Sequence, residues 1–149
     1  MKLRTSLVLL AAAAVLVLPA VARADDATLR TTLDTWSQKI GVDAHSVSLA
    51  AAAGHPRRMI YSAKRFRADA LKARAALAAE TPSTASGVQA RKLAVTAFTD
   101  YALAGRRWVL SGRAHIAHQF RLAAAYARAG GRYARAGNTL LVRAGTLIP

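Results

Sequence analysis

The chain has 149 residues, a net charge of +15 at neutral pH and no cysteine. The lack of cysteine excludes disulfide bonds, thiolate metal sites, covalent haem attachment and lipidation of an N-terminal cysteine. Apolar residues make up 54% of the chain and aromatic residues only 6%, so we expect a core of mostly small side chains.

The first 24 residues have the pattern of a bacterial Sec-type signal peptide. Lys2 and Arg4 give it a positive start, residues 7–18 are apolar, and residues 22–24 form a small-x-small cleavage site. The apolar run is shorter than the roughly 20 residues that span a bilayer as a helix. We therefore expect a signal peptide at 1–24, cleavage after Ala24, and a single helical domain at 25–149. The protein would be secreted or periplasmic, with no transmembrane segment after cleavage.

Two helices are predicted before residue 54. Leu29, Leu33, Trp36 and Ile40 fall on one face of a helix over residues 27–40, which should end at Gly41. A second, alanine-rich helix over residues 44–53 would begin after Asp43 as its N-cap.

The pattern of residues 56–80 predicts a helix that begins at Pro56, because proline suits the first turn. A turn at residues 80–86 overlaps the start of a long predicted helix at 84–129, in which Gly105 and Gly112 would let a partner backbone approach closely. Gly130 and Gly131 should end that helix, and residues 132–147 would form the last one.

No stretch of the chain alternates apolar and polar residues as a strand does. The expected fold is therefore all-α. The helices at 56–80 and 84–129 would form an antiparallel hairpin, extended to a four- or five-helix bundle with the spacing of a coiled coil.

The basic residues are unevenly distributed. After Asp100 the chain has eight arginines and no acidic residue. Continuous helical geometry would place arginines 106, 113, 121, 128 and 135 on one stripe. The candidate anion-binding residues are Lys92, Arg106, Arg107, Arg113, Arg121, Arg128, Arg132 and Arg135.

This stripe predicts an anionic partner: a lipid, a wall polymer or an acidic protein. Nucleic acid is not expected for an exported protein, and no aromatic side chains lie between the arginines to stack on bases. The alternative is that the arginines form only a solvated helix face, since an arginine- and alanine-rich chain also results from GC-rich coding.

His115 and His118 are one turn apart and could bind a metal, but no acidic residue lies near them in sequence. A G-x-S-x-G motif is absent, and so is cysteine. We therefore expect neither an enzyme nor a cofactor. A self-associating structural module and a helical bundle that binds a metal or small ligand remain as alternative functions.

Overall fold

The computed structural model describes residues 18–148. Most of the predicted signal peptide lies outside this range, and only the backbone is described for residues 18–24, which include the predicted cleavage site. The described chain forms four helices and no strand, which confirms the all-α prediction. Their bounds are α1 Leu18–Ala52, α2 Pro56–Ala79, α3 Ala85–Ile116 and α4 Phe120–Leu147.

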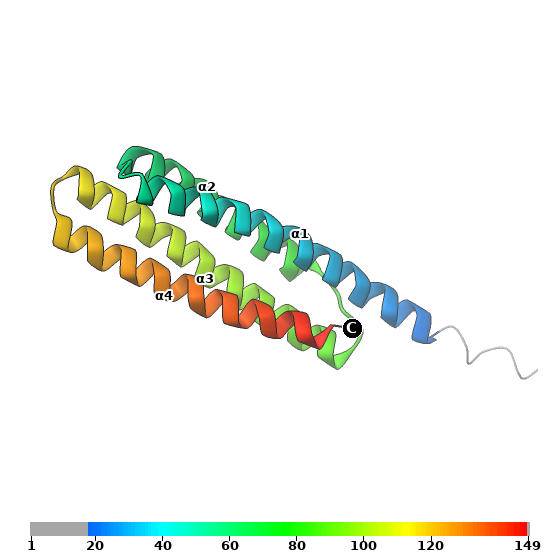
Figure 1. Ribbon diagram of the computed structural model, residues 1–149. Helices are drawn as coiled ribbons and strands as arrows, with labels where there is room; N and C mark the ends of the chain where they lie inside the picture. The colour runs from blue at the N-terminus through cyan, green and yellow to red at the C-terminus, as the bar shows by residue number, and fades with distance from the viewer. Residues whose placement is uncertain (1–17, 149) are drawn as a thin grey trace, which may run out of the picture.

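Consecutive helices run antiparallel, so the molecule is a rod with two turns at one end and one at the other (Figure 1). The chain packs mainly in sequence order, with α1 on α2, α2 on α3 and α3 on α4. The predicted antiparallel hairpin of the helices at 56–80 and 84–129 is present as α2 and α3, although α3 is shorter than its predicted counterpart.

The prediction of two helices before residue 54 is wrong, because α1 continues through Gly41 and Asp43. Asp43 is not an N-cap. It lies on the buried face of α1, one turn beyond Ile40 and before Val47, and is only 2% exposed. The repeat of inward positions is therefore unbroken across Gly41.

The prediction of one helix over residues 84–129 is also wrong. The chain turns back at residues 117–119, where His118 has a φ of 58°, and α4 begins at Phe120. Gly130 and Gly131 do not end a helix, since both lie inside α4. The buried edge of α4 is a row of small residues seven apart: Ala123, Gly130, Gly137 and Ala144.

The core lies around Phe66 on α2, which is fully buried. Its ring contacts Tyr101 and Trp108 of α3, with ring centroids 5.9 and 5.2 Å away. Of the other buried hydrophobic residues, 12 of 21 are alanine, as the composition suggested. In the part of the chain described, no helix has both the length and the apolar character needed to cross a bilayer.

Glycines bring α2 and α3 together, as the sequence predicts for positions 105 and 112. A Cβ atom on Gly105 would lie 3.1 Å from the carbonyl oxygen of Ala63 and 2.8 Å from the Cβ of Arg67. A Cβ atom on Gly112 would lie 2.6 Å from the Cγ1 of Ile60. The two backbones can adopt this spacing only because side chains are missing at both positions.

Candidate anion-binding surface

The turn at residues 117–119 divides the predicted arginine stripe between two antiparallel helices. Arg106 and Arg113 lie on α3, whereas Arg121, Arg128 and Arg135 lie on α4. The stripe is therefore not one continuous line. The expected alignment of arginines 106, 113, 121, 128 and 135 on one helix is wrong, because the helix ends at Ile116.

Arg106 and Arg113 instead line a groove between α2 and α3, together with Lys64 and Arg67 from α2. The groove has a volume of about 510 Å³. Its four cations are exposed at the rim. Its remaining lining is apolar and consists of Ala68, Leu71, Val109 and Leu110. None of its lining residues is acidic, so the positive charges there have no carboxylate partner in the groove.

The geometry of this groove depends on the close approach at Gly105. The Cβ atom of Arg67 packs against Gly105, the residue that precedes Arg106. Arg67 and Arg106 therefore lie at the same height along the rod. Arg106 and Arg113 are seven residues apart on α3, which corresponds to about 10 Å along the helix axis. An extended anion lying along the groove could therefore meet several cations in turn.

Lys64 and Arg67 are not among the residues predicted from sequence. Neither lies on the apolar face of the helix predicted at 56–80, so the sequence identifies them only as surface residues. Which flank of α2 faces the arginines of α3 depends on how the two helices are rotated against each other, and the glycine contacts determine that rotation.

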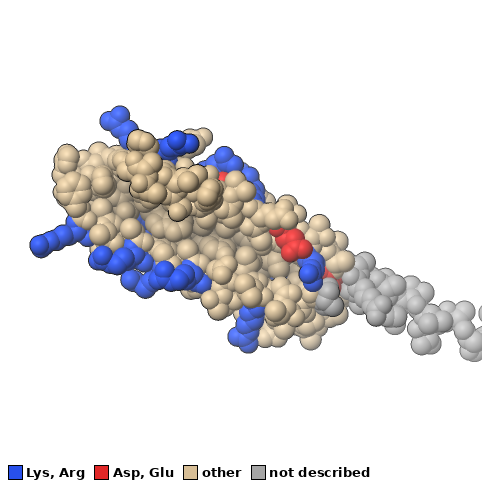
Figure 2. Space-filling view, in the orientation of Figure 1, with Lys and Arg blue, Asp and Glu red and all other residues tan. Residues whose placement is uncertain are grey.

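The α4 candidates form a second basic surface. Arg121, Arg128, Arg132 and Arg135 are exposed along this helix. Figure 2 shows Lys and Arg side chains following the edge of the molecule where α4 lies. Lys92 is exposed on α3, and Arg107 is half-buried there. Neither of these two lines the α2–α3 groove.

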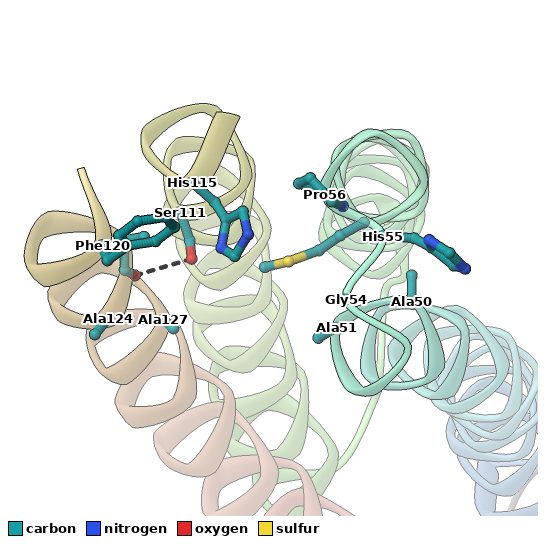
Figure 3. A pocket seen from close by; sticks show the side chains of 12 residues that line it. Ala50, Ala51, Gly54, His55, Pro56, Ser111, His115, Phe120, Ala124 and Ala127 are labelled. Carbon is teal, nitrogen blue, oxygen red and sulfur yellow. Dashed lines mark hydrogen bonds between the residues drawn. The ribbon is translucent and has the colours of Figure 1, made fainter. Parts of the chain in front are cut away.

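A separate recess of about 330 Å³ lies at the end of the rod that carries the two turns, and all four helices contribute to it. Figure 3 shows Ser111, His115 and Phe120 on one side, and Ala50, Ala51 and Pro56 on the other. The Ser111 hydroxyl donates a hydrogen bond of 2.9 Å to the carbonyl oxygen of Ala123, so this buried group is already used to join α3 to α4.

The two candidate metal ligands lie beside this recess. The rings of His115 and His118 both make T-shaped contacts with the ring of Phe120, at centroid distances of 5.2 and 5.9 Å. His55 lines the same recess, but its ring points away from His115 (Figure 3). Within residues 18–148 no three His, Asp or Glu side chains gather in a way that could hold a metal ion.

Two acidic side chains meet at the interface of α1 and α2. The Nε atom of Arg65 lies 2.9 Å from a carboxylate oxygen of Asp43. The carboxylate oxygens of Asp69 lie 3.2 Å from the Nζ atom of Lys39 and 3.5 Å from that of Lys72. Burial, and then a hydrogen bond to Asp69, raise the pKa of Asp43. Burial also acts to raise the pKa of Asp69, but bonds from Lys39 and Asp43 outweigh it and the pKa is lowered. The cluster joins α1 to α2.

Comparisons with protein-family models, with curated proteins and with solved structures find no match for this chain.

Proposed function

We propose that this is an exported, non-enzymatic binding protein that holds an anionic polymer of the bacterial envelope in the groove between α2 and α3. The observation that carries the proposal is the convergence of Lys64, Arg67, Arg106 and Arg113 on one groove without an acidic neighbour. Cations of one sign lining a concave surface attract polyanions and raise their local concentration.

The apolar part of the groove lining supports the same function. Leu71, Val109 and Leu110 line the groove together with the four cations and would limit the hydration of a bound anion. A phosphate or carboxylate that contacts the rim is therefore held where the effective dielectric constant is lower than in water, and its attraction to each cation is stronger. The exposed arginines of α4 would attract the polymer at longer range.

Export follows from the predicted signal peptide. Cleavage after Ala24 would leave Asp26 and Leu29 in place, and these are the first buried residues of α1 whose side chains are described. Mass spectrometry of protein recovered from outside the cytoplasm should then give a chain that starts at Asp25. Recovery of the intact leader would contradict this part of the proposal.

Titration with long-chain polyphosphate, a soluble polyanion, tests the groove. Replacing Arg67 and Arg106 by Gln should weaken binding about tenfold. It should also lower the slope of log affinity against log salt by about two, measured between roughly 50 and 200 mM salt. The matched control replaces Arg74 and Arg143 by Gln, two exposed arginines that do not line the groove.

The control has the same net charge as the groove variant, so a difference between them reports position rather than total charge. Equal losses in both variants would show that the groove has no special role. Binding that does not change with salt would overturn the electrostatic basis of the proposal.

A further inference from the structure

The two ends of the rod differ in chemistry. At the end where α2 joins α3, side chains are paired: Thr32 donates to Glu80 at 2.7 Å, Thr84 donates to Asp26, and Arg30 donates to the carbonyl oxygen of Ile148 at 2.7 Å. Acidic and basic groups both occur there, and they hold α1, α2, α3 and the end of α4 together.

The opposite end carries the turns at 53–55 and 117–119, and the second of these turns exposes three large apolar side chains. Ile116 is 43% exposed, Phe120 57% and Leu122 42%. They follow one another around the second turn, and Ile116 also lies against the start of α2. Exposed large apolar side chains that lie close together mark a surface that a partner can cover.

Cations lie beside these apolar side chains. Arg57 and Arg58 line the same surface hollow as Ile116, and Arg121 lines a second hollow with Phe120 and Leu122. The sequence contains no Asp or Glu between Asp43 and Asp69, or after Asp100, so no carboxylate belongs to the helix ends that meet here. We call Arg57, Arg58, Ile116, Phe120, Arg121 and Leu122 the turn-end patch.

We propose that the turn-end patch docks the protein end-on to an anionic lipid bilayer. Phe120, Leu122 and Ile116 would enter the interface between headgroups and acyl chains, while the arginines would contact lipid phosphates. Arginine suits this arrangement because its aliphatic stem can lie along apolar surface while its guanidinium reaches the headgroups. Each cation close to an anionic bilayer adds to the attraction.

Size and charge favour a bilayer over a protein as the partner. Three partly exposed side chains at the end of a narrow rod offer much less than the roughly 800 Å² that each partner buries in a standard protein interface. A second copy of this chain would bring the same positive charges against its own, and like charges repel across an interface. A bilayer needs only shallow insertion and many negative charges.

This inference does not depend on the α2–α3 groove, because none of the patch residues lines it. Binding to sedimented vesicles tests it, using an equal mixture of phosphatidylglycerol and phosphatidylcholine against phosphatidylcholine alone. Phe120→Ser with Leu122→Ser should reduce binding to the anionic vesicles about tenfold or more. The matched control is Val42→Ser with Val142→Ser, which removes two apolar side chains that are 63% and 61% exposed elsewhere.

The charge component has its own variant. Arg57→Gln with Arg58→Gln should weaken binding to the anionic vesicles and leave the weaker binding to phosphatidylcholine unchanged. Both variants of the turn-end patch should bind polyphosphate as the wild type does, because their groove is intact. Polyphosphate binding by the Arg67 and Arg106 variant therefore tests the proposed function independently of the turn-end patch.

The orientation is tested with an environment-sensitive dye on a single introduced cysteine, since the chain contains none. A dye at Gln119→Cys should shift to shorter emission wavelength on anionic vesicles, whereas a dye at Thr81→Cys, at the opposite end of the rod, should not. Both positions are exposed. The proposal is overturned if the Phe120 and Leu122 variant binds like its control, if only the Thr81 dye responds, or if the protein dimerises through the patch and leaves vesicles unbound.

Discussion

The indole ring of Trp108 on α3 occupies the space where a side chain at Gly130 on α4 would begin. Its Nε1 atom lies 2.5 Å from the position that a Cβ atom on Gly130 would take. The neighbouring Gly131 has no such constraint, since its Cβ would meet only the Nη1 atom of Arg135, at 3.5 Å. Two adjacent glycines in one helix thus have different roles.

Gly130→Ala should destabilise the protein by about 1–3 kcal/mol, because Trp108 would have to move out of a packed position. Gly131→Ala should stabilise it by about 0.5–1 kcal/mol, since alanine is the better helix former and finds space there. Urea unfolding followed by circular dichroism measures both. Stabilisation by both substitutions would mean that Trp108 does not restrict position 130.

Gly54 and Gly41 form a second pair with opposite expected effects. Neither would place a Cβ atom within 4 Å of a neighbour, but Gly54 has a φ of +64° in the turn between α1 and α2. Gly54→Ala should therefore cost about 1 kcal/mol through backbone conformation alone. Gly41→Ala should gain about 0.5–1 kcal/mol, because that residue lies inside a helix. Thermal unfolding of the two variants would check the signs.

Asp43→Asn should alter how stability depends on pH. The raised pKa of Asp43 means that the folded state binds more protons than the unfolded state above about pH 3.8, so this residue's contribution falls as the pH rises through that raised pKa. An asparagine amide can still donate to Asp69 and accept from Arg65, yet it cannot ionise. The variant should thus become more stable relative to wild type as the pH rises from about 4 to 7.

Asp43→Ala is the control, because it removes the hydrogen bonds as well as the charge. It should be less stable than wild type by about 1–3 kcal/mol at the acidic end of this range. Equal pH profiles for wild type and Asp43→Asn would show that folding does not raise the pKa of Asp43.

Tyr101 should make the protein sensitive to alkali. Burial raises the pKa of its phenol to about 12, from an ordinary value of 10. The unfolded state releases this proton first, so the free energy of unfolding should fall as the pH rises from about 10 towards 12. Tyr101→Phe should reduce that fall. Unfolding measured at several pH values above 9 would reveal the difference, and parallel curves would contradict it.

The apolar periodicity was sufficient to predict the class of fold and the second helix. Pro56 begins α2 as expected, because proline fits the first turn, and the stripe from Met59 to Leu77 is buried along its length. Gly105 and Gly112 were also correctly interpreted. Their positions on an apolar face already implied that another helix had to come close there.

Helix ends were predicted poorly where a glycine or an aspartate lies inside a helix. Gly41 and Asp43 resemble the end of one helix and the start of another, but Asp43 is buried against Arg65 from α2 and keeps the inward face of α1 continuous. The real turn at residues 117–119 contains neither glycine nor proline, and His118 adopts the left-handed conformation instead. A local sequence pattern shows neither the contact between Asp43 and Arg65 nor the left-handed conformation of His118.

The linear order of residues determined that the chain forms amphipathic helices with basic, acid-free stretches, since periodicity and charge are properties of the sequence itself. Only the packing of the helices decided which cations share a surface. The groove unites Arg106 and Arg113 with Lys64 and Arg67 rather than with the arginines of α4, because the chain reverses at His118 and the glycines of α3 determine how closely α2 approaches. Contacts between residues far apart in the chain depend on how closely α2 and α3 pack. That distance is a property of the pair of helices and cannot be read from the sequence of either one.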